Sequence, residues 1–244
     1  MESHTDNPCM TSSFRTLTLS PDTLNNLDQL GYNEMTPIQA ASLPLALAGQ
    51  DVIAQASTGS GKTAAFGLPL VEKLTANFHA VQALVLCPTR ELADQVTTEI
   101  RRLARATANI KVVTLCGGVA LRGQEQSLQH GAHVVVGTPG RILDHLTRGN
   151  LRLDSVKTLV LDEADRMLDM GFFDDMKQLI QQCPPKRQTL LFSATYPEGI
   201  AKLSAQFMRD PQTVKVQTVH AADKIKQLFY EVREDERLHA VSLL

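Results

Sequence analysis

The feature that most constrains the fold of this 244-residue chain is a series of seven short apolar runs separated by helical segments. The runs are rich in β-branched residues and mostly apolar without regular alternation, which is typical of strands that are buried on both sheet faces. Strands that alternate with helices need crossover connections, which produce a mostly parallel sheet with helices on both faces. We therefore predict an α/β fold with strands at Val52–Ala54, Ala83–Cys87, Val112–Leu115, Val134–Val136, Thr158–Leu161, Thr189–Phe192 and Val214–Val216.

Capping residues and one apolar stripe predict several of the helices. Ser20-Pro21 and Thr36-Pro37 each place a capping hydroxyl before a proline that suits the first position of a helix. Gly31 and Gly49 are placed to end these two helices. The clearest later helix is marked by apolar residues at spacings of four, four and three, namely Leu92, Val96, Ile100 and Leu103.

The pattern divides the chain into three parts. Residues 1–13 are polar and lack the apolar core of a signal peptide, so we expect a loose tail. Residues 14–220 contain the whole alternating pattern and form one predicted domain. At residues 221–244 we expect a linker, a strand at Ile225–Val232 and the start of a helix at Asp235–Leu244, which would begin a second domain.

Charge, hydropathy and cysteine usage exclude several classes of protein. Lysine plus arginine number 24 against 26 aspartate plus glutamate, a net charge of −2, which argues against binding of nucleic acid through a bulk positive field but leaves a local basic groove open. No apolar run approaches the roughly 18 residues of a membrane span, so we expect no membrane partner. The four cysteines, at positions 9, 87, 116 and 183, have no paired spacing, which predicts a reducing, cytoplasmic compartment.

A run of small residues joins the first predicted strand to a helix. The run comprises Ala56, Ser57, Thr58, Gly59, Ser60, Gly61, Lys62 and Thr63. Its backbone N–H groups and the helix N-terminus suit a bound anion, Lys62 suits the terminal phosphates of a nucleotide, and the Thr63 hydroxyl suits Mg²⁺. Ala56 stands where the strict phosphate-loop pattern has glycine, and the alternative is a glycine–serine turn with an unrelated lysine. Strand, loop and helix all fall where the motif requires them, so we predict a nucleotide phosphate site.

Two adjacent carboxylates follow the strand predicted at Thr158–Leu161. Mg²⁺ prefers hard oxygen ligands, and Asp162 is placed to hold the hydrated ion beside the phosphates. Glu163 is placed to orient or deprotonate an attacking water. An acidic helix start favoured by the helix dipole is the alternative for these residues taken alone. Combined with the phosphate loop, they predict ATP hydrolysis with Mg²⁺.

An ordered series of motifs covers the chain from about Phe14 to Val216. Its members are Gly31-Tyr32, Thr36-Pro37-Ile38-Gln39, Ala56 to Thr63, Pro88-Thr89-Arg90-Glu91-Leu92-Ala93, Gly117-Gly118, Thr138-Pro139-Gly140-Arg141, Asp162-Glu163-Ala164-Asp165 and Ser193-Ala194-Thr195. This series resembles the DEAD-box family of ATP-dependent RNA helicases, in which alanine is usual at the position of Ala56. The resemblance implies a RecA-like P-loop NTPase domain that forms the first lobe of a two-lobed motor, with residues 221–244 leading into a second RecA-like lobe.

The resemblance also implies roles for single residues. The Gln39 carboxamide would match the N6 and N7 edge of adenine, and Tyr32 would stack on the base with Phe14 as support. From the residues alone, it stays open whether Gln39 is a solvated helix residue and Tyr32 a core residue. Ser193 and Thr195 resemble residues that couple the phosphate site to RNA binding through Asp165. The predicted catalytic set is therefore Lys62, Asp162, Glu163, Ser193 and Thr195.

Three further loops resemble the RNA-binding motifs of the family. Their residues are Pro88, Thr89, Arg90, Gly118, Thr138, Pro139, Gly140 and Arg141. Each loop follows a predicted strand, so all should lie on the same edge of the sheet. Exposed backbone N–H groups and the two arginines suit RNA phosphates, and such contacts bind RNA without reading its sequence. Pairing of Arg90 with Glu91 or Asp94, and an ordinary turn at Thr138-Pro139-Gly140, are the structural alternatives.

The function expected from the resemblance is RNA-stimulated ATP hydrolysis coupled to local unwinding of RNA duplexes. Within the family, the segments Gln82–Cys87, Leu115–Gly118 and Arg187–Phe192 are most similar to the bacterial DbpA-type helicases, which act on large-subunit ribosomal RNA and so imply a role in ribosome assembly. The second lobe would supply arginines that stabilise charge on the transferring phosphoryl group, so this lobe alone should hydrolyse ATP slowly. An ATP-dependent RNA clamp or scaffold without productive unwinding, and a DNA-directed motor of the same fold, remain open.

Overall fold

The computed structural model describes residues 13–216 together with residues 232, 234 and 237. The predicted tail before Ser13 and the predicted linker, strand and helix of residues 221–244 lie outside the described residues, apart from those three positions. None of the helices in the described part is long and apolar enough to cross a membrane.

All seven predicted strands form and join one sheet in which every neighbouring pair is parallel. The order across the sheet is β3-β4-β2-β5-β6-β1-β7. The strands are β1 (Val52–Gln55), β2 (Ala83–Leu86), β3 (Val112–Leu115), β4 (Val134–Gly137), β5 (Thr158–Leu161), β6 (Gln188–Ser193) and β7 (Gln212–Lys215). The prediction of an α/β fold with a mostly parallel sheet is therefore confirmed.

Helices connect the strands, and the capping residues begin them as expected. Ser20 Oγ accepts a hydrogen bond from the Thr23 N–H at the start of α1. At the start of α2, the Thr36 N–H donates to Gln39 Oε1, whereas the Thr36 hydroxyl makes no capping hydrogen bond. The α-helices are α1 (Pro21–Gln29), α2 (Pro37–Leu47), α3 (Lys62–Glu72), α4 (Arg90–Leu103), α5 (Leu121–Gln129), α6 (Pro139–Thr147), α7 (Ala164–Asp169), α8 (Phe173–Gln182) and α9 (Glu198–Phe207), with short 3₁₀ turns η1 (Phe14–Thr16) and η2 (Ala104–Ala106).

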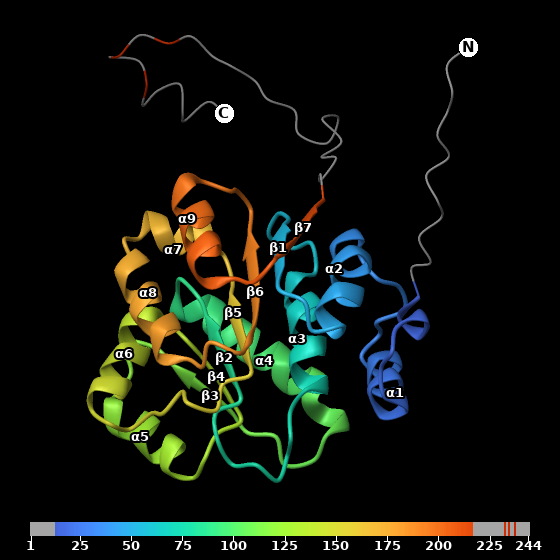
Figure 1. Ribbon diagram of the computed structural model, residues 1–244, viewed down its shortest axis with the longest axis horizontal. Coiled ribbons are helices and arrows are strands. Elements are labelled where there is room, and N and C mark those ends of the chain that lie inside the picture. The colour runs from blue at the N-terminus through green and yellow to red at the C-terminus, as the bar shows by residue number, and fades with distance from the viewer. Residues whose placement is uncertain (1–12, 217–231, 233, 235–236, 238–244) are drawn as a thin grey trace.

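The sheet is covered on both faces because its strands alternate between two apolar clusters. In β2, Val85 faces the cluster under α1 to α4, whereas Leu84 and Leu86 face the cluster under α6 to α9. Figure 1 shows α2 and α3 on one side of the sheet and α6, α7 and α8 on the other. Because both faces are buried, every residue of β2, β4, β5 and β6 is buried, which explains the unbroken apolar runs in the sequence.

The strand order sorts the candidate loops into two groups at the carboxyl edge of the sheet. The loops that follow β3, β4 and β2 carry the candidate RNA-binding residues, and these three strands are neighbours. The loops that follow β5, β6 and β1 carry the candidate nucleotide residues, and these strands are neighbours as well. Carboxyl edges of parallel sheets are where α/β proteins bind ligands, so the fold brings the two predicted sites side by side.

Candidate active site and nucleic-acid interface

The small-residue loop between β1 and α3 contains two glycines in the left-handed conformation. Gly59 and Gly61 have φ angles of 80° and 92°, which side-chain-bearing residues rarely adopt. A Cβ atom at Gly61 would also lie 2.6 Å from Gln39 Nε2 and 2.9 Å from Thr36 Oγ1. The Ala56 N–H donates to Ser193 O over 3.1 Å, which ties the start of the loop to the end of β6. Glycine is therefore required at position 61 both by the backbone and by the packed side chains.

Lys62 lies below this loop with most of its hydrogen-bonding capacity unused. Its side chain is only 6% exposed, and its ammonium group donates to Ala56 O over 3.2 Å. Among the described residues it makes no other hydrogen bond and no ion pair within 4.0 Å. An ammonium group has three donors, and a buried charge is costly without a partner. The environment of Lys62 therefore suits an anionic ligand such as a phosphate group.

Asp162 and Glu163 follow β5 and face the phosphate loop. Asp162 is 2% exposed, and burial raises the pKa of its carboxyl from 3.8 to about 6, against the opposing effect of the Lys62 charge. Its Oδ1 accepts a hydrogen bond of 3.0 Å from the Glu163 N–H. Glu163 has a φ of 50°, a left-handed conformation that costs a non-glycine residue about 1–2 kcal/mol. Its carboxylate accepts a hydrogen bond of 3.2 Å from the Thr58 hydroxyl, so the loop and the carboxylates are in direct contact.

A cleft of about 540 Å³ brings these groups together with residues from α2 and α4. The residues predicted to bind nucleotide or metal that line it are Tyr32, Gln39, Thr58, Gly59, Gly61, Lys62, Thr63 and Asp162, and the predicted catalytic residue Glu163 lines it as well. Ala56, Ser57 and Ser60 do not line it: the Ala56 side chain is buried below the loop, where its carbonyl holds Lys62. The predicted nucleotide site is thus one continuous surface.

Gln39 and Tyr32 are both fixed by protein contacts within this cleft. Gln39 is 2% exposed, so the alternative of a solvated helix residue is wrong. Its Nε2 donates to Gly61 O over 3.0 Å, while its Oε1 accepts from the Thr36 N–H over 2.9 Å. These bonds use one donor and one acceptor of the carboxamide and leave one of each. The Tyr32 ring packs edge-on against Phe14 at 5.9 Å, and its hydroxyl donates to Glu99.

Helix α4 contributes two cleft residues that the sequence analysis missed, Gln95 and Glu99. They follow Leu92 at intervals of three and four residues, so all three share one face of the helix. This spacing is the signal that would have found them. Burial and the hydrogen bond to Glu99 raise the pKa of Tyr32, so its hydroxyl stays protonated and oriented at neutral pH.

Asp165 links the end of β6 to the start of α7. Its N–H donates to Ser193 Oγ over 3.2 Å, and its Oδ2 accepts from both the N–H and the hydroxyl of Thr195 over 2.9 Å. Burial opposes ionisation, but these hydrogen bonds outweigh it and lower the pKa of Asp165. Ser193 is fully buried, and neither Ser193 nor Thr195 lines the cleft. Both contact Asp165, as the sequence analysis expects, and their place in the catalytic set stays a prediction.

The candidate RNA-binding loops come together beside this cleft. The Arg90 Nη1 atom would lie 3.7 Å from a Cβ placed at Gly118, and the Arg141 Nη1 donates to Val119 O over 3.0 Å. Arg90 also pairs with Asp94 at 3.7 Å on an exposed surface, so this structural alternative holds in part. An exposed pair of this kind contributes little stability, and a phosphate can compete for the arginine.

The candidate RNA-binding residues differ in their exposure to solvent. Thr89 and Thr138 are half-buried at the starts of α4 and α6, and the Thr89 hydroxyl caps α4 by accepting from the Leu92 N–H over 3.3 Å. Gly118 and Gly140 are exposed. Pro88 and Pro139 are buried, and their predicted part in RNA binding stays a prediction. Each proline also fixes the backbone φ at the turn that follows its strand.

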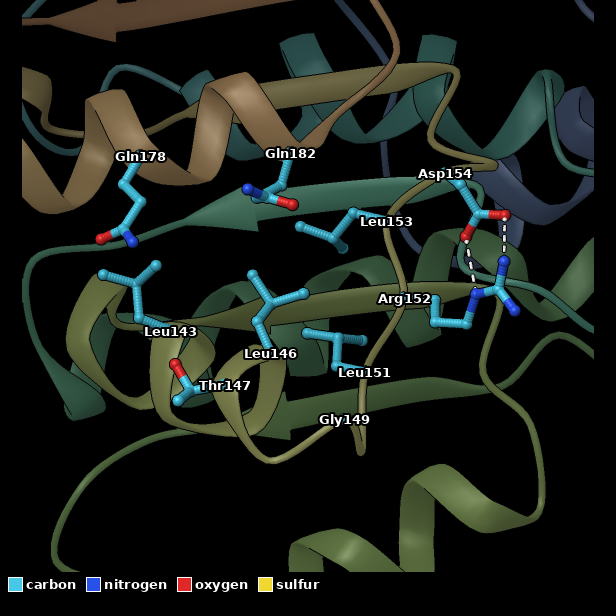
Figure 2. Close-up of a pocket in the computed structure, with 10 residues that line it drawn as sticks. All are labelled: Leu143, Leu146, Thr147, Gly149, Leu151, Arg152, Leu153, Asp154, Gln178 and Gln182. Carbon is cyan, nitrogen blue, oxygen red and sulfur yellow. Dashed lines mark hydrogen bonds and ion pairs between the residues drawn. The ribbon is translucent and has the colours of Figure 1, made fainter.

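A second hollow of about 470 Å³ lies between α6 and α8 (Figure 2). Leu143 and Leu146 from α6 and Gln178 and Gln182 from α8 point into it. The only charged side chains that line it, Arg152 and Asp154, pair with each other at 3.1 Å. None of the residues predicted to act in catalysis or binding lines this hollow, so the chemistry is concentrated at the carboxyl edge of the sheet.

A phosphate loop that faces a buried aspartate and an adjacent glutamate at the edge of a parallel sheet defines a P-loop nucleoside-triphosphatase lobe. The model of the DEAD/DEAH box helicase family matches residues 36–203. The chain belongs to this family.

Relatives and solved structures agree with this assignment. The chain is 57% identical over 221 residues to the ATP-dependent RNA helicase DbpA of Escherichia coli K12, covering 90% of this chain and 48% of that protein. It is 46% identical over 234 residues to the DEAD-box ATP-dependent RNA helicase CshA of Geobacillus kaustophilus, covering 96% and 50%. A crystal structure of a DEAD box protein from Methanococcus jannaschii superposes with a TM-score of 0.81 at 42% identity, covering 95% of this chain and 62% of that one. The chain thus spans about half the length of the curated relatives it matches.

Proposed function

We propose that this chain is the ATP-binding lobe of an ATP-dependent RNA helicase, in which ATP hydrolysis is coupled to local unwinding of RNA duplexes. The observation that carries the proposal is the sorting of the motif loops at one sheet edge, with the nucleotide group after β5, β6 and β1 and the RNA group after β3, β4 and β2. A nucleotide bound to the first group of loops would lie beside an RNA bound to the second group. Coupling between the two binding sites requires this arrangement.

In this proposal the phosphate loop and Lys62 hold the phosphates of ATP, and Gln39 and Tyr32 hold its adenine. Three observations fit such a ligand: the nearly unpartnered ammonium of Lys62, the spare donor and acceptor of Gln39, and the buried Thr36 hydroxyl without a hydrogen-bond partner among the described residues. Each is a polar group that would gain a partner when a polar ligand enters the cleft.

Asp162 and Thr63 are the residues that would hold Mg²⁺, because both line the cleft beside Lys62. When bound, Mg²⁺ would neutralise charge that develops on the phosphates during transfer. Burial keeps Asp162 partly protonated near pH 6, and a bound cation favours its ionised form. The carboxylate of Glu163, held close to the loop by Thr58, would accept the proton of the attacking water.

Asp165 would connect hydrolysis to RNA binding, since it is bonded to Ser193 and Thr195 and follows Glu163 by two residues. The RNA would lie along the loops of Arg90, Gly118 and Arg141, held by backbone contacts that do not read sequence. The similarity to DbpA supports ribosomal RNA as target and ribosome assembly as the process.

A second RecA-like lobe would supply the arginines that complete the active site. The chain covers 48% and 50% of DbpA and CshA, which leaves room for such a lobe in a protein of their length. The cysteines 87, 116 and 183 are free and buried, which supports a reducing compartment such as the cytoplasm.

Calorimetric titration of the chain with Mg²⁺-ATP and Mg²⁺-GTP tests the nucleotide part. We expect ATP to bind more tightly than GTP, and Lys62→Ala to weaken ATP binding about tenfold or more, because a charge-assisted contact contributes about 1.5–3 kcal/mol. The matched control is Lys186→Ala, which removes an exposed lysine before β6, at the opposite edge of the sheet. Equal affinities of the wild type and Lys62→Ala would overturn the proposed phosphate site.

A further inference from the structure

A buried carboxamide lies beneath the candidate RNA loops. Gln124 is 7% exposed, and it is the one residue of α5 that is buried. An amide in this position is destabilising unless its donors and acceptors are paired. The partners of Gln124 therefore show what the residue does.

Gln124 bridges the loop after β3 and the start of α6. Its Nε2 donates to Cys116 O over 2.9 Å, at the residue that precedes Gly117 and Gly118. Its Oε1 accepts from Arg141 Nη1 over 3.2 Å and from His145 Nε2 over 3.0 Å. Since Arg141 Nη1 also donates to Val119 O over 3.0 Å, one guanidinium nitrogen is held from two sides.

The chemistry of these partners fixes the direction of each hydrogen bond in the cluster. The Cys116 carbonyl can only accept and the guanidinium of Arg141 can only donate, so the amide of Gln124 has one possible orientation. His145 must then donate through Nε2. Its Nδ1 is buried without a partner among the described residues, and a proton there would have no acceptor, so the neutral ring is favoured. Burial, and then the charge of Arg141, lower the pKa of His145, which agrees with a neutral ring.

Arg141 keeps both its charge and most of its donors in this arrangement. Within the described part of the chain, its Nε and Nη2 have no hydrogen-bond partner, and it forms no ion pair within 4.0 Å. The anchor is a neutral carboxamide rather than a carboxylate, so it positions the guanidinium without neutralising it. An arginine held in this way is prepared to bind a phosphate with its remaining N–H groups.

We propose that Gln124 is a positioning residue for RNA binding, which holds Arg141 and the Gly117-Gly118 loop in register so that Arg141 meets an RNA phosphate. This inference rests on the proposed function, because it assumes that RNA binds along these loops. It adds a residue that contacts no RNA itself, and it assigns the phosphate contact to the free side of Arg141.

NMR titrations of the ¹⁵N-labelled 244-residue chain with a single-stranded RNA oligomer test the inference, since this method detects weak as well as tight binding. In the wild type we expect shifts at Arg90, Gly118 and Arg141. Gln124→Leu, of similar volume, should weaken RNA binding about three- to tenfold. Its affinity should also depend less on salt, with a slope lower by about 0.7, the value for one phosphate contact on a single strand. The matched control is Gln126→Leu, at an exposed position of the same helix.

Two further variants separate positioning from a merely structural role. If Gln124 acts through Arg141, the double variant Gln124→Leu with Arg141→Met should bind RNA no more weakly than Arg141→Met alone, whereas independent effects would add. Gln124→Glu keeps the shape of the side chain but neutralises Arg141, so it should show the same lower salt slope. It serves in place of the leucine variant if that variant does not fold, as judged by its amide spectrum.

The outcomes distinguish this inference from the function on which it rests. Wild-type RNA affinity and salt slope in folded Gln124→Leu or Gln124→Glu would overturn the role of Gln124 and leave the proposed RNA edge intact. Additive losses in the double variant would also overturn it. An absence of RNA-induced shifts at the three loops of the wild type would overturn the proposed RNA edge itself. Titration with Mg²⁺-ADP should give the same nucleotide affinity for all variants.

Discussion

The buried carboxyl of Asp162 makes the ligand-free protein less stable than it would be with a neutral residue there. Its pKa of about 6 lies above the ordinary value of 3.8, mainly because burial disfavours the charged form. We predict that Asp162→Asn stabilises the chain at neutral pH while it abolishes Mg²⁺-dependent nucleotide binding. The asparagine Oδ1 can keep the 3.0 Å hydrogen bond from the Glu163 N–H.

The size of this effect follows from the pKa. A rise from 3.8 to about 6 corresponds to about 3 kcal/mol, since each tenfold change in proton affinity is worth about 1.4 kcal/mol. The folded protein binds this proton more tightly than the unfolded chain does. Wild-type stability therefore falls as the pH rises from about 4 to 6, and the loss is complete above about pH 7. The asparagine variant has no such loss, so its advantage grows over the same range.

Urea unfolding at pH 4.5 and pH 8, without nucleotide or Mg²⁺, measures this difference. We expect Asp162→Asn to exceed the wild type by about 2–3 kcal/mol at pH 8 and by much less at pH 4.5. Asp169→Asn, at an exposed position on α7, is the control and should change stability by less than about 0.5 kcal/mol at both pH values. An asparagine variant that is less stable than the wild type at pH 8, or equally favoured at both pH values, would refute the reasoning.

Three other predictions follow from single sites. Gly137→Ala should destabilise the chain by at least about 3 kcal/mol in thermal unfolding, because its Cβ would lie 2.0 Å from the Leu115 carbonyl oxygen. In a protein that carries residues 1–244 and a second RecA-like lobe, Glu163→Gln should lower ATP turnover about 10²- to 10⁴-fold and keep ATP binding, as measured by steady-state assay and calorimetry. Gln39→Ala should reduce the preference for ATP over GTP about tenfold and lower the melting temperature, because it breaks two buried hydrogen bonds.

Each of these predictions has an outcome that would count against it, and two of them have a matched control. Gly123→Ala lies in α5 with nothing within 4 Å, so it should stabilise by up to about 1 kcal/mol, and equal effects at Gly137 and Gly123 would contradict the steric argument. Intact RNA remodelling by Glu163→Gln after turnover stops would favour a clamp over a motor. Gln178→Ala, at an exposed glutamine of α8, should leave nucleotide selectivity unchanged, and an unchanged ATP preference in Gln39→Ala would remove Gln39 from the adenine site.

The strands and the capped helices could be predicted because their signals are local. Apolar runs such as Val134–Val136 are long enough to identify strands, and Ser20 and Thr36 identify helix starts without knowledge of the rest of the fold. The order of the strands could not be predicted, because pairing depends on contacts between distant segments. The separation of the loops into a nucleotide half and an RNA half follows from that order alone.

The site could be predicted where a loop motif carries the chemistry and not where a helix face does. The phosphate loop with Asp162 and Glu163 lies as expected, whereas Gln95 and Glu99 reach the cleft from α4 with only their helical spacing as a signal. No pattern marks Gln124, because a buried glutamine is recognised only by its partners. The burial of Ser193 could not be predicted either, because its place in a motif gives no information on its burial.

The most direct test of the central claim is the rate of ATP hydrolysis with and without RNA, for residues 1–244 alone and joined to a second RecA-like lobe. We predict slow hydrolysis with little effect of RNA for the single lobe, and hydrolysis that RNA stimulates strongly for the two lobes together. Robust RNA-stimulated turnover by residues 1–244 alone, or turnover of the joined lobes that RNA does not change, would contradict the account.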